Sequence, residues 1–256
     1  MTYDRLGNGL SDKPDAYKVV QASLQLEILR GISVAARDGS LLKHNNDSTN
    51  SNLEGANFRK LIHVGHSFGS ILTTGLLTTY GSLSDAAVIT GYIPNPHFPE
   101  MRKTAFDFAY APNHKFSDRT SGYLTQGSPR GVQNIFFSTL SHADSQIGGF
   151  EPKLLNYAYE IRQTITTSEL QAPRVNMGVA GDFKGPVQYV LAEYDFPVCR
   201  GDCKLPFDVG MLEDNFPAGK GVEIYTQPGA GHALTMHRGA EGGYKATFAW
   251  LGRKGL

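Results

Sequence analysis

Five consecutive residues, Gly65-His66-Ser67-Phe68-Gly69, constrain the fold of this chain more than any other part of its sequence. They follow a short apolar run, residues 61–64, and precede a helix-forming segment, residues 70–80. A serine between two glycines at such a junction occupies a sharp turn that exposes its hydroxyl at the edge of a sheet. The pattern predicts that Ser67 is a nucleophile and that the Phe68 N–H donates to an oxyanion at the positive end of the helix. The alternative is a tight glycine turn with a chance serine.

Apolar runs and helix-forming segments alternate along much of the chain. Four runs are typical of buried strands: residues 61–64, Ala86–Thr90, Val187–Ala192 and residues 222–225. A closing helix is predicted over residues 245–251. Strands that alternate with helices predict a mostly parallel sheet with crossover helices, and therefore an α/β fold.

An early helix is indicated by apolar residues at every fourth position. Val20, Leu24, Ile28 and Ile32 would form one apolar stripe. Asp15 is predicted to cap the N-terminus of this helix.

In the middle of the chain the alternation of predicted strands and helices is interrupted, and the sequence is rich in aromatic residues. We predict that residues 1–93 and 183–256 form the core and that residues 94–182 form a helical cap inserted between its strands. Helices are expected near residues 130–138 and 153–164. The alternative is an ordinary run of core helices.

A carboxylate comes directly after the third predicted strand, in Glu193-Tyr194-Asp195. Because the carboxyl ends of parallel strands meet at one edge of a sheet, Asp195 is expected on the same edge as Ser67. Its role would be to orient a histidine and to stabilise the imidazolium. Glu193 and Asp202 are the alternatives.

Of the eight histidines, His232 is the predicted base. It follows the fourth predicted strand and a run of small residues that lets the loop return toward the sheet edge. It would take the proton of Ser67 and then donate it as a general acid. His237 is expected to be a surface or packing residue, His66 to line the substrate pocket and His63 to lie in the core.

Composition excludes several classes of function. The 24 Lys and Arg residues balance 24 Asp and Glu residues, so a basic nucleic-acid footprint is not expected. No apolar run reaches the roughly 20 residues that span a bilayer, and residues 1–5 do not begin a signal peptide. Cys199 and Cys203 make a poor metal site. The residues between the two cysteines are typical of a turn, which would bring the sulfurs together. The cysteines therefore either pair in a local disulfide or remain two free thiols.

Four segments resemble the α/β-hydrolase superfamily: residues 3–11, residues 65–70, Tyr194-Asp195 and Gly231-His232. The first is similar to the D-x-x-G-x-G-x-S loop of its epoxide-hydrolase-like and esterase-like branch. With two cysteines just after the acid, the chain most resembles fungal hydrolases of that branch, except in the middle segment. The resemblance implies the α/β-hydrolase fold and hydrolysis with no metal or organic cofactor.

The sequence departs from the superfamily near its start. In the family this loop follows the fourth strand, whereas here it begins at Asp4. The resemblance therefore implies that three strands are missing, together with the His-Gly loop that donates a second oxyanion N–H. The strand at residues 61–64 would lose a neighbour. We expect either a shortened version of a longer enzyme or a short protein with impaired activity. In the first case, the lack of a signal peptide in this sequence does not decide whether the enzyme is secreted.

The leading hypothesis is hydrolysis of an ester or related acyl bond by Ser67, His232 and Asp195. The aromatic middle segment favours a small apolar substrate. A serine nucleophile argues against dehalogenase and epoxide-hydrolase chemistry, since those relatives use aspartate. The alternatives are a hydrolase-like protein that binds a ligand with little turnover, and a fragment without function of its own.

Overall fold

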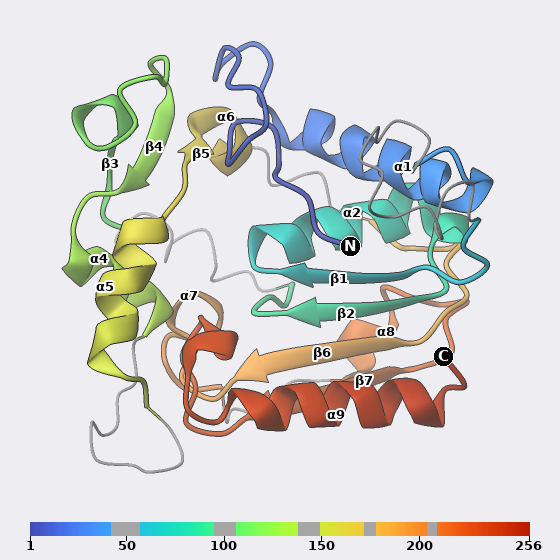
Figure 1. The fold of residues 1–256 in the computed structure, drawn as a ribbon. Coiled ribbons are helices and arrows are strands. Elements are labelled where there is room, and N and C mark those ends of the chain that lie inside the picture. The colour runs from blue at the N-terminus through green and yellow to red at the C-terminus, as the bar shows by residue number, and fades with distance from the viewer. Residues whose placement is uncertain (42–56, 95–105, 138–148, 172–177, 204–208) are drawn as a thin grey trace, which may run out of the picture.

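The computed structural model describes residues 1–41, 57–94, 106–137, 149–171, 178–203 and 209–256. A four-stranded parallel sheet in the order β1-β2-β6-β7 forms its centre (Figure 1). These strands are β1 (Ile62–His66), β2 (Ala86–Thr90), β6 (Val187–Ala192) and β7 (Val222–Gln227). All four predicted strands are present, and their parallel pairing confirms the predicted sheet.

The central strands are buried on both faces, which explains their unbroken apolar sequence. Ala87 and Ile89 of β2 pack on one face in a cluster that includes Leu77. Ala86 and Val88 point to the other face and pack against Trp250. β1, in contrast, pairs only with β2 among the described residues and forms one edge of the sheet.

Helices cover both faces of the parallel sheet (Figure 1). The long ones are α1 (Ala22–Asp38), α2 (Phe68–Tyr80) and α9 (Ala240–Arg253), while α7 (Phe196–Cys199) and α8 (Val209–Glu213) are short. None of the helices in the described ranges has the length and apolar character of a membrane-spanning segment.

The N-terminal helix differs from its prediction. α1 begins at Ala22, and Asp15 instead accepts hydrogen bonds from the backbone N–H groups of Tyr17 and Lys18, so the predicted cap is wrong. The carboxylate stabilises a turn before the helix, which is a common alternative for aspartate. The face that packs on α2 is also rotated from the predicted stripe, because Leu26 and Leu29 make the contact.

Between β2 and β6 the chain forms a second unit beyond the carboxyl ends of the parallel strands (Figure 1). Its helices are α4 (Pro129–Phe136), α5 (Pro152–Ile161) and α6 (Thr167–Gln171). It also contains an antiparallel sheet in the order β3-β4-β5, which the sequence did not predict. Those strands are β3 (Phe108–Tyr110), β4 (Tyr123–Gln126) and β5 (Ile165–Thr166), too short to show an alternating pattern.

The parallel arrangement decides where functional side chains gather. β1 ends at His66, β6 ends at Ala192 and β7 ends at Gln227. The loops that follow these three strands leave the same edge of the sheet, facing the second unit. Residues far apart in the sequence therefore meet there.

Candidate active site

Ser67 occupies a strained turn between β1 and α2. Its φ and ψ are 53° and −114°, a region that non-glycine residues rarely adopt. The Ser67 N–H donates to the Thr90 carbonyl at 2.9 Å, and the Ser67 carbonyl accepts from Ser70 and Ile71 at the start of the helix. These bonds hold the strained conformation.

The two glycines of the motif have different surroundings. A Cβ on Gly65 would lie 2.5 Å from the carbonyl oxygen of Gly69 and 2.6 Å from the backbone nitrogen of Ser70. A Cβ on Gly69 would meet nothing within 4 Å. Only Gly65 is therefore required for β1 to approach the first turn of α2 so closely.

We expect Gly65→Ala to destabilise the protein by about 1–3 kcal/mol and to reduce any Ser67-dependent activity, because backbone atoms must move to admit the methyl group. Gly69→Ala, the matched control in the first turn of α2, should change stability by less than about 1 kcal/mol. Urea unfolding midpoints of the two variants measure the difference. Equal midpoints would contradict the assigned geometry.

His232 lies between Ser67 and Asp195. Its Nε2 is 2.8 Å from the Ser67 Oγ, and its Nδ1 is 2.8 Å from the Asp195 Oδ2. The side chains of His232 and Asp195 are 1% and 0% exposed. Because a carboxylate only accepts, Nδ1 carries the proton and Nε2 is free to accept from the serine hydroxyl.

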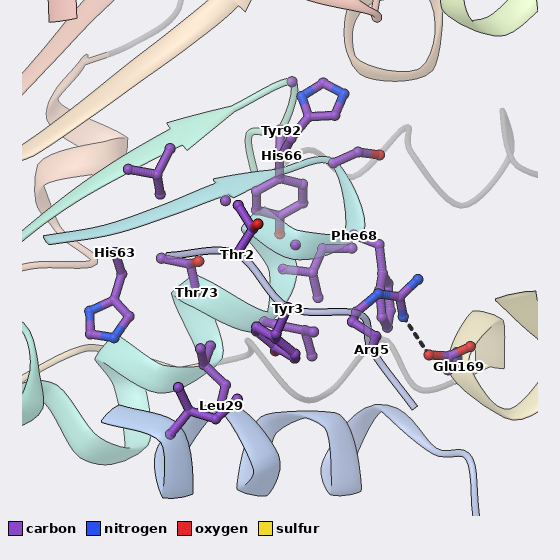
Figure 2. Close-up of a pocket in the computed structure, with 18 of the residues that line it drawn as sticks. Thr2, Tyr3, Arg5, Leu29, His63, His66, Phe68, Thr73, Tyr92 and Glu169 are labelled. Carbon is purple, nitrogen blue, oxygen red and sulfur yellow. Dashed lines mark hydrogen bonds and ion pairs between the residues drawn. The ribbon is translucent and has the colours of Figure 1, made fainter. Parts of the chain in front are cut away.

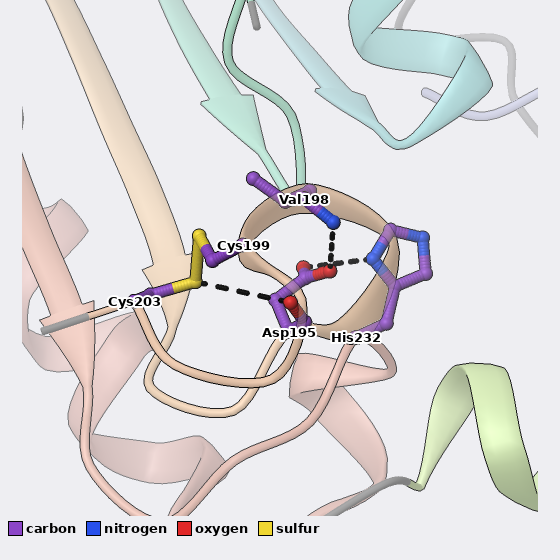
Figure 3. The surroundings of a disulfide bond; sticks show 5 residues. All are labelled: Asp195, Val198, Cys199, Cys203 and His232. Carbon is purple, nitrogen blue, oxygen red and sulfur yellow. Dashed lines mark hydrogen bonds and ion pairs between the residues drawn. A yellow bond between two sulfur atoms is a disulfide. The ribbon is translucent and has the colours of Figure 1, made fainter. Parts of the chain in front are cut away.

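Local structure directs the carboxylate of Asp195, and not those of the two alternative acids, toward His232. Asp195 is the N-cap of α7, and its Oδ1 accepts from the Val198 N–H at 3.0 Å (Figure 3). That bond turns Oδ2 toward His232. The Glu193 Oε2 instead accepts from the Gly229 N–H at 2.7 Å, while Asp202 is exposed on the following turn. Glu193 therefore stabilises the loop that leads to His232.

His237 is buried and holds the His232 loop in place. Its Nδ1 donates to the Ala233 carbonyl at 2.8 Å, and its Nε2 accepts from the Gly231 N–H at 3.0 Å. Both ring nitrogens are thus satisfied by the neutral form, and burial lowers the pKa of His237. It is a packing residue rather than a surface residue.

His63 also makes contacts through both ring nitrogens. It bridges Ser33 and Ser84 at 2.9 Å each. Burial, with a smaller contribution from Arg37, lowers the pKa of His63 to about 4. His63 is only partly buried and lines the cavity beside Ser67, so its predicted place in the core is wrong.

A disulfide joins Cys199 and Cys203 in the turn that follows Asp195 (Figure 3). The Cys199 N–H donates to the Asp195 carbonyl at 2.9 Å, and the Cys203 N–H donates to the Glu193 carbonyl at 2.8 Å. The crosslink therefore closes a small loop whose two cysteines donate hydrogen bonds to the backbone of Asp195 and Glu193.

Loss of the disulfide should loosen this turn. We expect the Cys199→Ser/Cys203→Ser double variant to lose about 2 kcal/mol of unfolding free energy, as the entropy of closing a five-residue loop suggests. Any Ser67-dependent activity should fall with it, because Asp195 is held less firmly. Urea unfolding with and without reductant measures the effect. The variant should be insensitive to reductant, and an unchanged midpoint would argue against this role.

A cavity of about 1080 Å³ opens beside Ser67. His66 and Phe68 line this cavity, which extends between β1 and α1. Much of its wall is apolar and comes from both the core and the second unit: Leu29, Ile32, Val64, Ile71, Phe108 and Phe136. This volume is slightly above the usual range for small-molecule sites, which are mostly apolar with a few polar groups.

A partly buried ion pair that the sequence did not indicate lies at one end of this cavity. The Arg5 Nη1 lies 2.5 Å from the Glu169 Oε1, and the guanidinium stacks 4.6 Å from the centre of the Phe68 ring (Figure 2). Gln25 donates to the same carboxylate oxygen at 3.0 Å. The pair links the N-terminal loop, α6 and the residue after the candidate nucleophile. Arg5 lies in the D-x-x-G-x-G-x-S segment, but nothing in the sequence pointed to Glu169.

Within the part of the chain that the structure describes, no three His, Cys, Asp or Glu side chains form a group that could hold a metal ion.

Comparisons with known proteins address the fold. Neither a protein-family model nor a curated protein sequence matches the chain. Tomato methylketone synthase I complexed with 2-tridecanone aligns with a TM-score of 0.59 and 12% identity, over 98% of this chain and 86% of that one. A methylesterase from Arabidopsis aligns with a TM-score of 0.54 and 15% identity, over 96% and 84%.

A third structure, described as an α/β-hydrolase-fold protein from Chitinophaga pinensis, has a TM-score of 0.53 and 15% identity, over 96% of this chain and 74% of that one. At such low identities the likeness carries information about architecture and not about activity. Together with the parallel sheet and its flanking helices, these alignments show that the chain has the α/β-hydrolase fold.

Proposed function

We propose that this protein is a serine hydrolase that cleaves an ester or related acyl bond of a small apolar substrate. The observation that carries the proposal is the hydrogen-bonded series from Ser67 through His232 to Asp195. A serine hydroxyl is a weak nucleophile unless a base takes its proton, and an imidazole held by a buried carboxylate is such a base. The comparisons with esterase structures support the fold on which this chemistry would operate.

In the proposed reaction, the Ser67 Oγ attacks the carbonyl carbon and His232 Nε2 takes the hydroxyl proton. Asp195 stabilises the imidazolium that forms. The Phe68 N–H, at the start of α2, would donate to the oxyanion. His232 then protonates the leaving group, and a water molecule activated by the same histidine hydrolyses the acyl-enzyme.

We further propose that residues 94–182 act as a cap over the site. The Phe136 ring from α4 lies 5.8 Å from the His232 ring, and the Phe136 carbonyl accepts from the Ala233 N–H at 2.9 Å. The second unit thus contributes a wall of the cavity directly beside the proposed base. An apolar wall there favours substrates whose groups near the scissile bond are hydrophobic.

A fluorophosphonate probe tests the proposal, because it reacts covalently with activated serines and not with ordinary ones. We expect the folded protein to gain one label, which peptide mapping places on Ser67. Exposed Ser82 is an internal control and should remain unmodified, and urea-unfolded protein should not react. A folded protein that binds apolar ligands but takes no label would instead be a hydrolase-like binding protein.

A further inference from the structure

His66 stands directly before Ser67, and its ring lines the cavity (Figure 2). The centres of the His66 and His232 rings are 4.9 Å apart. Gly91 leaves room for both rings, since a Cβ there would lie 2.7 Å from the His66 Cε1 and 3.1 Å from the His232 Cε1. Any group that His66 binds would therefore lie close to the bond that Ser67 attacks.

The contacts of Thr90 determine which ring nitrogen of His66 carries the proton. The Thr90 Oγ1 lies 2.9 Å from the Gly65 carbonyl oxygen and 2.9 Å from the His66 Nδ1. A carbonyl only accepts, so the single hydroxyl proton of Thr90 points to Gly65. The threonine oxygen then accepts from His66, which places the proton of the neutral ring on Nδ1. The opposite tautomer would leave two oxygen acceptors facing each other at 2.9 Å.

Two effects keep the His66 ring neutral. Desolvation by the protein around the ring, with a smaller contribution from the neighbouring His232, lowers the pKa of His66 to about 3. The ring is nevertheless accessible from the cavity. Its Nε2 therefore presents an unprotonated lone pair, for which no described residue provides a donor.

We propose that His66 Nε2 is a hydrogen-bond acceptor that selects acyl substrates with a hydroxyl or N–H group next to the scissile carbonyl. This rests on the proposed function of Ser67. Because much of the cavity wall is apolar, a substrate with only hydrocarbon at this point would leave the nitrogen desolvated and unpaired, which is unfavourable. A substrate with a donor satisfies it. Thr90 acts as a positioning residue, because it sets the tautomer.

Matched ester pairs test the selectivity. The first pair is p-nitrophenyl 3-hydroxybutyrate and p-nitrophenyl butyrate, and the second is 2-hydroxyethyl butyrate and ethyl butyrate. In at least one pair, we expect the wild-type kcat/KM to be about tenfold higher for the ester that carries the hydroxyl group. His66→Leu should remove the preference. Because the ratio is taken within one variant, partial loss of folded protein cancels. Equal ratios in wild type and His66→Leu for both pairs would overturn the proposal.

Variants of Thr90 separate the tautomer from general disruption. Thr90→Val removes the acceptor for Nδ1 but keeps the shape, so the preference should fall as it does in His66→Leu. Thr90→Ser keeps the hydroxyl and should keep the preference. If Thr90→Val retains the full preference, the role assigned to Thr90 and the resulting acceptor at Nε2 are wrong.

Long-range ¹H–¹⁵N NMR of the histidines gives a readout that does not depend on activity. We expect His66 to show a protonated Nδ1 and an unprotonated Nε2 throughout the neutral pH range. In Thr90→Val the ring should lose this fixed tautomer. A protonated Nε2 in the wild type would overturn the proposal. If neither ester is hydrolysed, the proposed function fails, while the spectrum still decides the state of His66.

Discussion

Ser67→Ala should lower kcat for p-nitrophenyl butyrate hydrolysis on the order of 10⁵–10⁶-fold, the loss seen when a serine nucleophile of this type is removed. The Ser67 Oγ is the atom that His232 contacts at 2.8 Å, and alanine leaves the base without a nucleophile to activate. Steady-state rates of the purified variant measure the effect. Its unfolding midpoint should stay close to that of the wild type, since the hydroxyl faces the cavity.

Two further variants make this result specific. Ser82→Ala, at an exposed position beyond α2, should retain wild-type activity. A Ser67→Ala/His232→Ala double variant should be no slower than Ser67→Ala alone, because residues that act as a unit are not additive. Residual hydrolysis that is the same in wild type and Ser67→Ala would mean that another group performs the reaction.

Asp195→Asn should lower kcat by about 10⁴-fold with little change in the structure of the site. An amide in place of the carboxylate can donate to His232 Nδ1, which favours the tautomer with its proton on Nε2. That nitrogen then cannot accept the Ser67 proton. The burial of both side chains prevents water from restoring the original arrangement. Kinetics on p-nitrophenyl butyrate and an unfolding curve together measure the effect.

The alternative acids provide matched controls for Asp195. Glu193→Gln retains an oxygen acceptor for the Gly229 N–H and should cost only a small part of the activity. Asp202→Asn changes an exposed carboxylate on the disulfide turn and should have no measurable effect on kcat. A loss in either variant as large as that of Asp195→Asn would show that the acid has been assigned to the wrong residue.

The core sheet was predictable because its strands carry their own signal. The bounds of β2 and β6 agree with the apolar runs, since strands buried on both faces have few polar residues. The short strands β3 and β5 carry no such pattern. They form through pairing with β4, which is up to 43 positions away in the sequence, as in the Tyr123–Thr166 pair. Asp15 illustrates another limit of prediction from the sequence, because an aspartate before a helix can either cap that helix or stabilise a turn.

The sequence by itself determined where the four parallel strands lie along the chain, the position of the sharp turn at Ser67 and a short set of candidates for its base and acid. These features depend on local composition and on spacing after apolar runs. Tertiary structure alone decided which carboxylate reaches His232, because that depends on the direction imposed on Asp195 by α7. It also distinguished Gly65 from Gly69 and placed the proton of His66, because both depend on atoms brought into contact by folding.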